Sequence, residues 1–223
     1  MGGAAASKVS PRPPAPLPMF ETATGLPPVT LFFLVLNGVI GAYTLLVNPE
    51  FIDRWAFKPF RVVREKEWSR WLTAGFVHVG FAHLAFNMIT LYFFGPYIEE
   101  ILGAGRFLAV YLGSELTANA LTYWRHKDNP AYSAVGASGA ISGVLFAFCL
   151  FEPFSLLYIF FAIPIPAILF AVLYVGLSIY ASRREIGRVA HEAHLGGALG
   201  GLALTILLYP AAVSIFLQQI GLG

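Results

Sequence analysis

Long apolar stretches recur along most of this chain, and they constrain its fold more than any other feature. A helix needs about 20 mostly apolar residues to cross the hydrocarbon core of a bilayer. Such stretches lie near residues 28–47, 79–98, 104–124, 134–151, 154–180 and 190–217. Only 12% of the residues are charged, whereas soluble domains carry about 25%. The sequence therefore predicts an all-α integral membrane protein with six transmembrane helices and both chain ends on one side.

Three segments depart from this pattern. Residues 1–26 are rich in Ala, Pro and Gly and have no long apolar run, so we expect a disordered tail before a membrane domain at 27–223. Two prolines interrupt the fifth stretch, which predicts a kink or local unwinding there. Residues 48–78 are too charged to cross the membrane. Their mixture of charges with aromatic residues predicts a loop lying in the membrane interface: Trp55, Phe57, Phe60, Trp68 and Trp71.

Basic residues are distributed unevenly between the two sides of the predicted bundle. The side that carries the chain ends has Lys8, Arg12 and Arg106, which leaves eleven of the 14 Lys and Arg residues on the other side. The positive-inside rule would place that second side in the cytoplasm. The basic residues form no clustered stripe away from the membrane flanks, so no nucleic-acid partner is indicated.

Polar residues occur at a common depth in three of the stretches. The second, fourth and sixth stretches all enter the membrane from the same side, and they carry His83 with Asn87, Ser138, and His194, respectively. A helix rises 1.5 Å per residue, which puts His194 about 9 Å below Arg188. Counting back from the far end of the fourth stretch gives Ser138 a similar depth. The spacing therefore predicts that a serine, a histidine and an asparagine share one level.

Small residues at four-residue spacing favour close packing of the fourth and sixth helices. Such residues allow two helix backbones to approach each other in a bilayer. The two rows are Gly139, Gly143 and Ala147 in one helix and Ala193, Gly197 and Gly201 in the other. The second row adjoins His194, so contact between the rows would bring the imidazole beside Ser138.

This combination of residues suits acyl transfer. A serine hydroxyl becomes nucleophilic when an imidazole takes its proton. Asn87 and His83 share a helix face, and both offer N–H groups for a developing oxyanion, as do backbone N–H groups around Ser138. No intramembrane Asp lies near His194 in the sequence, which favours a Ser–His dyad over a triad. Hydrolysis at this depth requires a polar cavity that opens on the same side.

The motifs together resemble the rhomboid family of intramembrane serine proteases. The resemblance covers residues 64 to about 205, and Arg70 in the preceding loop also matches a family position. Some relatives have an aromatic residue four positions after the serine, where this chain has Ser142. The matching motifs are His78-x4-His83-x3-Asn87, Gly95-x3-Glu99-x3-Gly103, Gly136-Ala-Ser138-Gly139 and Ala193-His194-x2-Gly197-x3-Gly201.

The resemblance implies a function and a role for each matching residue. Ser138 would be the nucleophile and His194 the general base, while His83 and Asn87 would assist the oxyanion. Arg70 and Glu99 would hold the interfacial loop and the turn after the second helix. The glycines would support the site structurally: Gly136, Gly139, Gly197 and Gly201.

The resemblance also implies the setting of the reaction. Transmembrane protein substrates would enter laterally from the bilayer, past the second and fifth helices. No metal or organic cofactor would take part. The chain would lie in a bacterial cytoplasmic membrane with its active site facing outward, which is opposite to the orientation that the basic residues indicate.

Four other interpretations of these residues remain open. Ser138 alone could be a packing residue on a helix face. His191 and His194 flank "EA" in a sequence that differs from HExxH, the zinc-binding helix motif, which disfavours a metalloprotease. A transporter would favour internal repeats, and none is evident. A pseudoprotease would bind membrane clients without cutting them, but it would be expected to lack Ser138 or His194.

Overall fold

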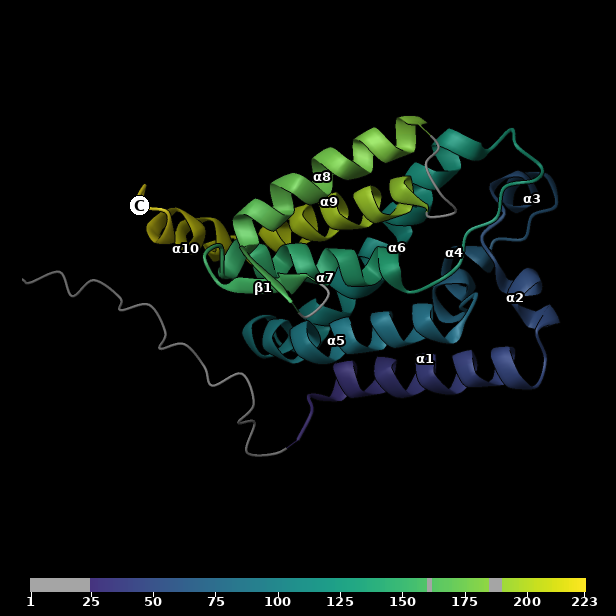
Figure 1. Ribbon diagram of the computed structural model, residues 1–223, viewed down its shortest axis with the longest axis horizontal. Helices are drawn as coiled ribbons and strands as arrows, with labels where there is room; N and C mark the ends of the chain where they lie inside the picture. Colours follow the sequence, from purple (N-terminus) through teal and green to yellow (C-terminus); the bar gives the residue numbers. More distant parts are fainter. Residues whose placement is uncertain (1–24, 160–161, 185–189) are drawn as a thin grey trace, which may run out of the picture.

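The computed structural model describes residues 25–159, 162–184 and 190–223, so the predicted tail lies almost entirely outside the described residues. The described chain is mainly helical (Figure 1). Its elements in order are α1 (Pro28–Leu46), α2 (Glu50–Trp55), α3 (Pro59–Arg64), α4 (Arg70–Thr73), the 3-10 helix η1 (Ala74–Phe76), α5 (Phe81–Leu102), α6 (Ala104–His126), α7 (Ser138–Phe151), β1 (Leu156–Ile159), β2 (Ile163–Pro166), α8 (Ala167–Arg184), α9 (His191–Leu208) and α10 (Ala211–Gln219).

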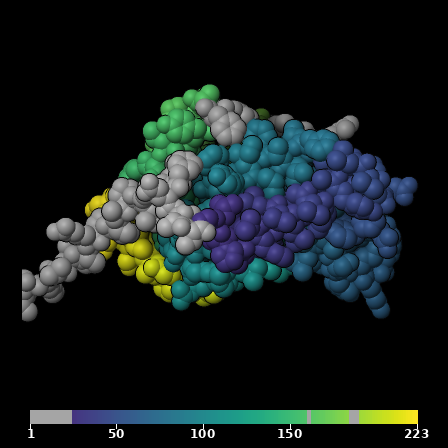
Figure 2. Space-filling model, turned by 90° about the horizontal axis from the view of Figure 1, so that it is seen from below, coloured from purple at the N-terminus to yellow at the C-terminus, as the bar shows by residue number. Residues whose placement is uncertain are grey.

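The long helices lie side by side around α7. Helices α6, α7 and α9 pack closely against one another, α1 lies against α5, and α8 rests on α9 and α7 (Figure 1). Between Gly139 and Phe151 every residue of α7 except Leu145 is buried. A helix that is apolar on all sides forms the core of such a bundle. By contrast, α1 lies on the outside, where Figure 2 shows it in purple.

The apolar stretches predict the helices well at the start of the chain and less well at its end. Helices α1, α5 and α6 match the first three stretches to within a few residues. The fourth helix begins at Ser138, later than predicted. In the fifth stretch, Pro164 and Pro166 lie in the strand β2, which pairs with β1 before α8 begins. The sixth stretch does not form one continuous helix, because α9 ends at Leu208 and α10 turns away by 108°.

Length and hydropathy identify fewer membrane spans than the sequence pattern does. Of the helices in the described residues, α1 qualifies by itself, with a hydropathy of 2.0 over its most apolar window. Two bent pairs also qualify if each pair counts as one span, which gives up to 3 spans. Those pairs are Arg70–Phe76 with α5, bent by 95°, and α9 with α10.

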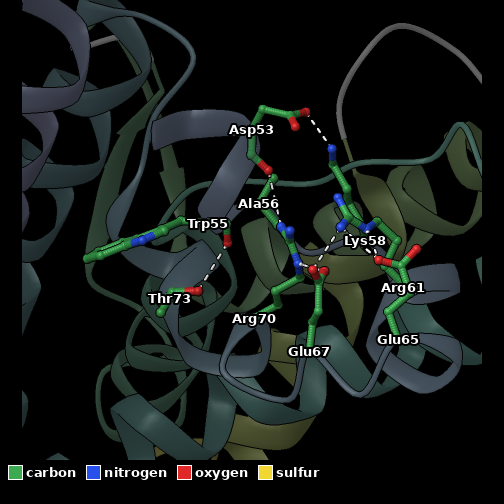
Figure 3. A network of polar contacts seen from close by, with 9 residues as sticks. All are labelled: Asp53, Trp55, Ala56, Lys58, Arg61, Glu65, Glu67, Arg70 and Thr73. Carbon is green, nitrogen blue, oxygen red and sulfur yellow. Dashed lines mark hydrogen bonds and ion pairs between the residues drawn. The ribbon is translucent and has the colours of Figure 1, made fainter. Parts of the chain in front are cut away.

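The predicted interfacial loop folds into short helices fixed by Arg70. The Arg70 side chain is buried, and its guanidinium donates to the backbone oxygens of Asp53 at 3.1 Å and Ala56 at 2.6 Å (Figure 3). Its Nε donates to Glu67 at 2.5 Å. A guanidinium presents several donors in a fixed plane, so one side chain joins three parts of the loop.

Glu99 has a structural role that differs from the predicted one. Its carboxylate accepts hydrogen bonds from Val29 N at 2.9 Å and from Thr30 N at 2.7 Å. The Thr30 hydroxyl donates to the same carboxylate at 2.8 Å. These N–H groups belong to the first turn of α1 and have no partner within their own helix. Glu99 therefore caps and anchors α1, whereas the sequence analysis assigned it to the turn that follows α5.

Candidate active site

The loop before α7 determines where Ser138 lies. Backbone hydrogen bonds join Phe57 to Ala134 in both directions, at 2.8 and 3.0 Å, and join Gly136 N to Ala74 O at 2.9 Å. The interfacial segment thus holds in place the loop that leads into α7, and Ser138 is the first residue of that helix. At Gly136 the backbone φ is +112°, and an added Cβ would lie 2.4 Å from His83 Cε1. Only glycine satisfies both the conformation and the contact.

Ser138 and His194 meet across the contact between α7 and α9. His194 lies in the first turn of α9, and its Nε2 is 2.8 Å from Ser138 Oγ. A methyl group added at Gly197 would lie 2.1 Å from the carbonyl oxygen of Gly139, so the two backbones are in direct contact there. The close approach predicted from the small residues is confirmed, and it produces the predicted hydrogen bond between serine and histidine.

His83 and Asn87 lie in the same cavity as Ser138 and His194. Asn87 Nδ2 and His83 Nδ1 are buried, and neither has a hydrogen-bond partner among the described residues. A buried amide donor without a partner is costly unless it serves a ligand. Because they line one cavity, the four residues that the sequence analysis assigned to the reaction lie together in the structure. His78 is also buried, and its Nε2 lies 3.5 Å from Ala137 N.

A cavity of about 940 Å³ leads to Ser138. It opens at the end of the bundle where α6 ends and α9 begins, which is the side on which the sequence analysis required a polar cavity. Its polar lining residues include Arg125, His126, Asn129, Tyr132, Ser133, Ser182, His191 and Glu192. Such a lining gives water a route to a serine located within the bundle.

Glu192 is the centre of a polar cluster that the sequence analysis missed. Its Oε1 accepts a hydrogen bond from the Tyr132 hydroxyl and lies 2.9 Å from His126 Nε2. Tyr132 also stacks on His126, with ring centroids 3.7 Å apart. Burial and the nearby carboxylate raise the pKa of Tyr132 above its ordinary value, so the phenol remains a donor. The cluster joins α6, the following loop and α9 beside the cavity.

The second missed residue is Tyr174 on α8, which faces the His194 ring. The two rings are stacked, with centroids 6.3 Å apart and planes at 24°. The Tyr174 hydroxyl lies 2.7 Å from Ser142 Oγ, so Ser142 bonds to an aromatic side chain from another helix. No carboxylate forms an ion pair with His194 among the residues that the structure describes. No sequence spacing pointed to Tyr174, because its partners lie on other helices.

A family model and the relatives with similar sequences all point to one protein family. The family model for the rhomboid domain matches residues 65–211. The chain is 37% identical over 127 residues to the putative rhomboid protease YdcA of Bacillus subtilis, covering 56% of this chain and 63% of that protein. It is 31% identical over 175 residues to the rhomboid protease GluP of Bacillus subtilis, covering 78% and 31%. It is 30% identical over 142 residues to the mitochondrial RHOMBOID-like protein 12 of Arabidopsis thaliana, covering 57% and 42%. The chain thus spans less than two thirds of the length of each of these relatives.

Proposed function

This chain belongs to the rhomboid family of membrane-embedded proteins, and from that premise we propose that it is an intramembrane serine endopeptidase. It cleaves transmembrane segments of membrane proteins, with Ser138 and His194 acting as a catalytic dyad. The observation that carries the proposal is the 2.8 Å separation between His194 Nε2 and Ser138 Oγ at the end of a polar cavity. An imidazole at that distance is within reach of the serine proton.

The proposed reaction proceeds in two stages. Ser138 Oγ attacks the scissile carbonyl carbon while its proton passes to His194 Nε2. Asn87 Nδ2, His83 and backbone N–H groups at the start of α7 stabilise the negative charge that develops on the carbonyl oxygen. The imidazolium then gives the proton to the amine nitrogen as the scissile C–N bond breaks, and the acyl group stays bonded to Ser138 Oγ as an ester. Water from the cavity, deprotonated by His194, hydrolyses this ester and restores the serine.

The proposal includes six membrane spans, namely α1, α5, α6, α7, α8 and α9. Substrates enter laterally between α5 and α8, and both helices expose large apolar side chains to their surroundings, such as Phe86 and Leu177. The chain lies in a bacterial cytoplasmic membrane with the cavity facing outward. A cysteine placed at the exposed Asp128, with Cys149 replaced by Ala, should react with an impermeant maleimide added outside intact cells. Reaction from the cytoplasmic side alone would contradict this orientation.

A fluorophosphonate probe tests whether Ser138 is activated. The purified protein in detergent should be labelled covalently, and His194→Ala should lower the labelling rate by about 10²–10⁴-fold, since the general base is lost. Lys127→Ala, at an exposed position just after α6, should keep a rate close to that of the wild type. The rates are measured by intact-protein mass spectrometry over time.

A pseudoprotease would give a different result. It would remain unlabelled when folded, and it would retain a membrane client without cleaving it. Equal labelling of wild type and His194→Ala would also contradict the dyad.

A further inference from the structure

The proposed Ser–His dyad does not by itself explain what fixes the orientation of the His194 imidazole. In a triad, a carboxylate bonded to Nδ1 fixes the imidazole in the orientation that the reaction needs. In the part of this chain that the structure describes, no Asp or Glu forms an ion pair with His194. The imidazole loses its hydrogen bond to Ser138 each time the serine reacts. The His191 ring also contacts it, edge to face with centroids 6.5 Å apart, but His191 lies on the same helix and does not connect the imidazole to α7.

Tyr174 supplies a second contact that remains when the serine reacts. Its ring lies nearly parallel to the imidazole, with planes at 24° and centroids 6.3 Å apart. Offset stacking of aromatic rings is favourable at centroid distances of about 4.5–7 Å. The contact is with the face of the ring, so both imidazole nitrogens remain free to exchange protons.

Other contacts fix the Tyr174 ring itself. Its hydroxyl lies 2.7 Å from Ser142 Oγ, which in turn donates to the backbone oxygen of Ser138 at 2.7 Å. Phe146 and Phe170 each contact the ring with centroids 5.4 Å away. The Tyr174 ring is thus tied to the first turn of α7, where Ser138 lies. A chain of contacts from Ser138 through Ser142 and Tyr174 returns to His194.

We propose that Tyr174 is a positioning residue, which holds the His194 imidazole in the plane needed for proton transfer to and from Ser138. The inference rests on the proposed serine protease function and adds a residue from α8 to the machinery of α7 and α9. Because Tyr174 belongs to α8, the orientation of the imidazole depends on α8 being packed against α7. Removing the Tyr174 ring should therefore impair turnover more than substrate binding.

The test compares four single variants and one double variant with the wild-type protein in detergent. Tyr174→Leu removes the ring, Tyr174→Phe keeps the ring without its hydroxyl, and Ser142→Ala removes the hydroxyl's partner. Tyr180→Leu is the matched control, because Tyr180 is an exposed tyrosine on the same helix. Each variant is measured for fluorophosphonate labelling rate, for kcat and KM on a transmembrane substrate, and for its thermal unfolding midpoint.

We expect Tyr174→Leu to lower kcat and the labelling rate about 100-fold with KM little changed, the effect of a misplaced catalytic group. Tyr174→Phe should lower kcat only about fivefold relative to the wild type, which corresponds to the loss of one neutral hydrogen bond. Ser142→Ala loses the same contact with Tyr174 and also the bond to Ser138 O, so its activity should fall at least as far as that of Tyr174→Phe. Combining the two should add nothing beyond Ser142→Ala, because the contact that they share is already lost. Tyr180→Leu should be indistinguishable from the wild type.

A readout that does not depend on turnover completes the test. The ring current of Tyr174 should shift the His194 imidazole proton resonances, and this shift should be lost in Tyr174→Leu and kept in Tyr174→Phe. Wild-type-like kcat and labelling in a folded Tyr174→Leu variant would overturn the inference and leave the protease function standing. An unlabelled, folded wild-type protein would instead overturn the function, and the inference with it.

Discussion

Replacing Ser138 by alanine should reduce cleavage of a transmembrane substrate by about 10⁶-fold, to the background rate. The variant lacks the oxygen that attacks the carbonyl, and no neighbouring hydroxyl takes the same position at the start of α7. The substitution removes one hydrogen bond, to His194 Nε2, so the free energy of unfolding should fall by only about 1 kcal/mol. Cleavage of a purified substrate in proteoliposomes is followed over time by gel electrophoresis.

Ser133→Ala is the matched control for this loss. Ser133 is an exposed serine that lines the same cavity, and its removal should leave the cleavage rate within a factor of about two. Substantial cleavage by a well-folded Ser138→Ala protein would show that another group is the nucleophile. Equal losses in both variants would indicate damage to the cavity and would leave no special role for Ser138.

Alanine at Gly197 should have the largest effect on stability. Its Cβ would lie 2.1 Å from Gly139 O, and that oxygen belongs to the backbone and cannot rotate away. Helices α7 and α9 must therefore separate, at a cost of about 3 kcal/mol in the free energy of unfolding. The separation also lengthens the distance from Ser138 to His194, and a shift of that kind should slow fluorophosphonate labelling about 100-fold.

Gly176→Ala on α8 is the matched control, and it should stabilise the protein. An added Cβ at Gly176 meets nothing within 4 Å, so the substitution should raise the free energy of unfolding by about 0.5–1 kcal/mol through helix propensity. Both variants are unfolded in mixed micelles with increasing SDS and followed by circular dichroism. A Gly197→Ala protein as stable as Gly176→Ala would contradict the close backbone contact.

The sequence predicted the pairing of Ser138 with His194 because helix geometry converts residue number directly into depth. The small residues around Gly139 and Gly197 then indicated which helices touch. The fold of residues 154–166 and the turn after Leu208 were harder to predict, because an apolar stretch has the same composition whether it forms one helix, a hairpin or two helices. Hydropathy reports the surroundings of a segment and carries little information about its backbone.

The contacts of Tyr174, Glu192 and Glu99 were not predictable from sequence spacing. Each joins segments far apart in the chain: 32 residues separate Tyr174 from Ser142, and 66 separate Glu192 from His126. Such pairs depend on the rotation of each helix about its own axis, which a uniformly apolar sequence leaves undetermined. For Glu99, only the fold reveals that its partner is the first turn of α1.

The contact of Gly197 and Gly201 with the backbone of α7 has a consequence for how such a chain can evolve. The separation of serine and imidazole is set there by main-chain atoms, whose dimensions do not vary with side-chain identity. Substitutions elsewhere on the bundle, such as those on the outward face of α1, can therefore accumulate without disturbing it. Sequence drift is tolerated over most of the surface, while a few glycines preserve the spacing between the two helices.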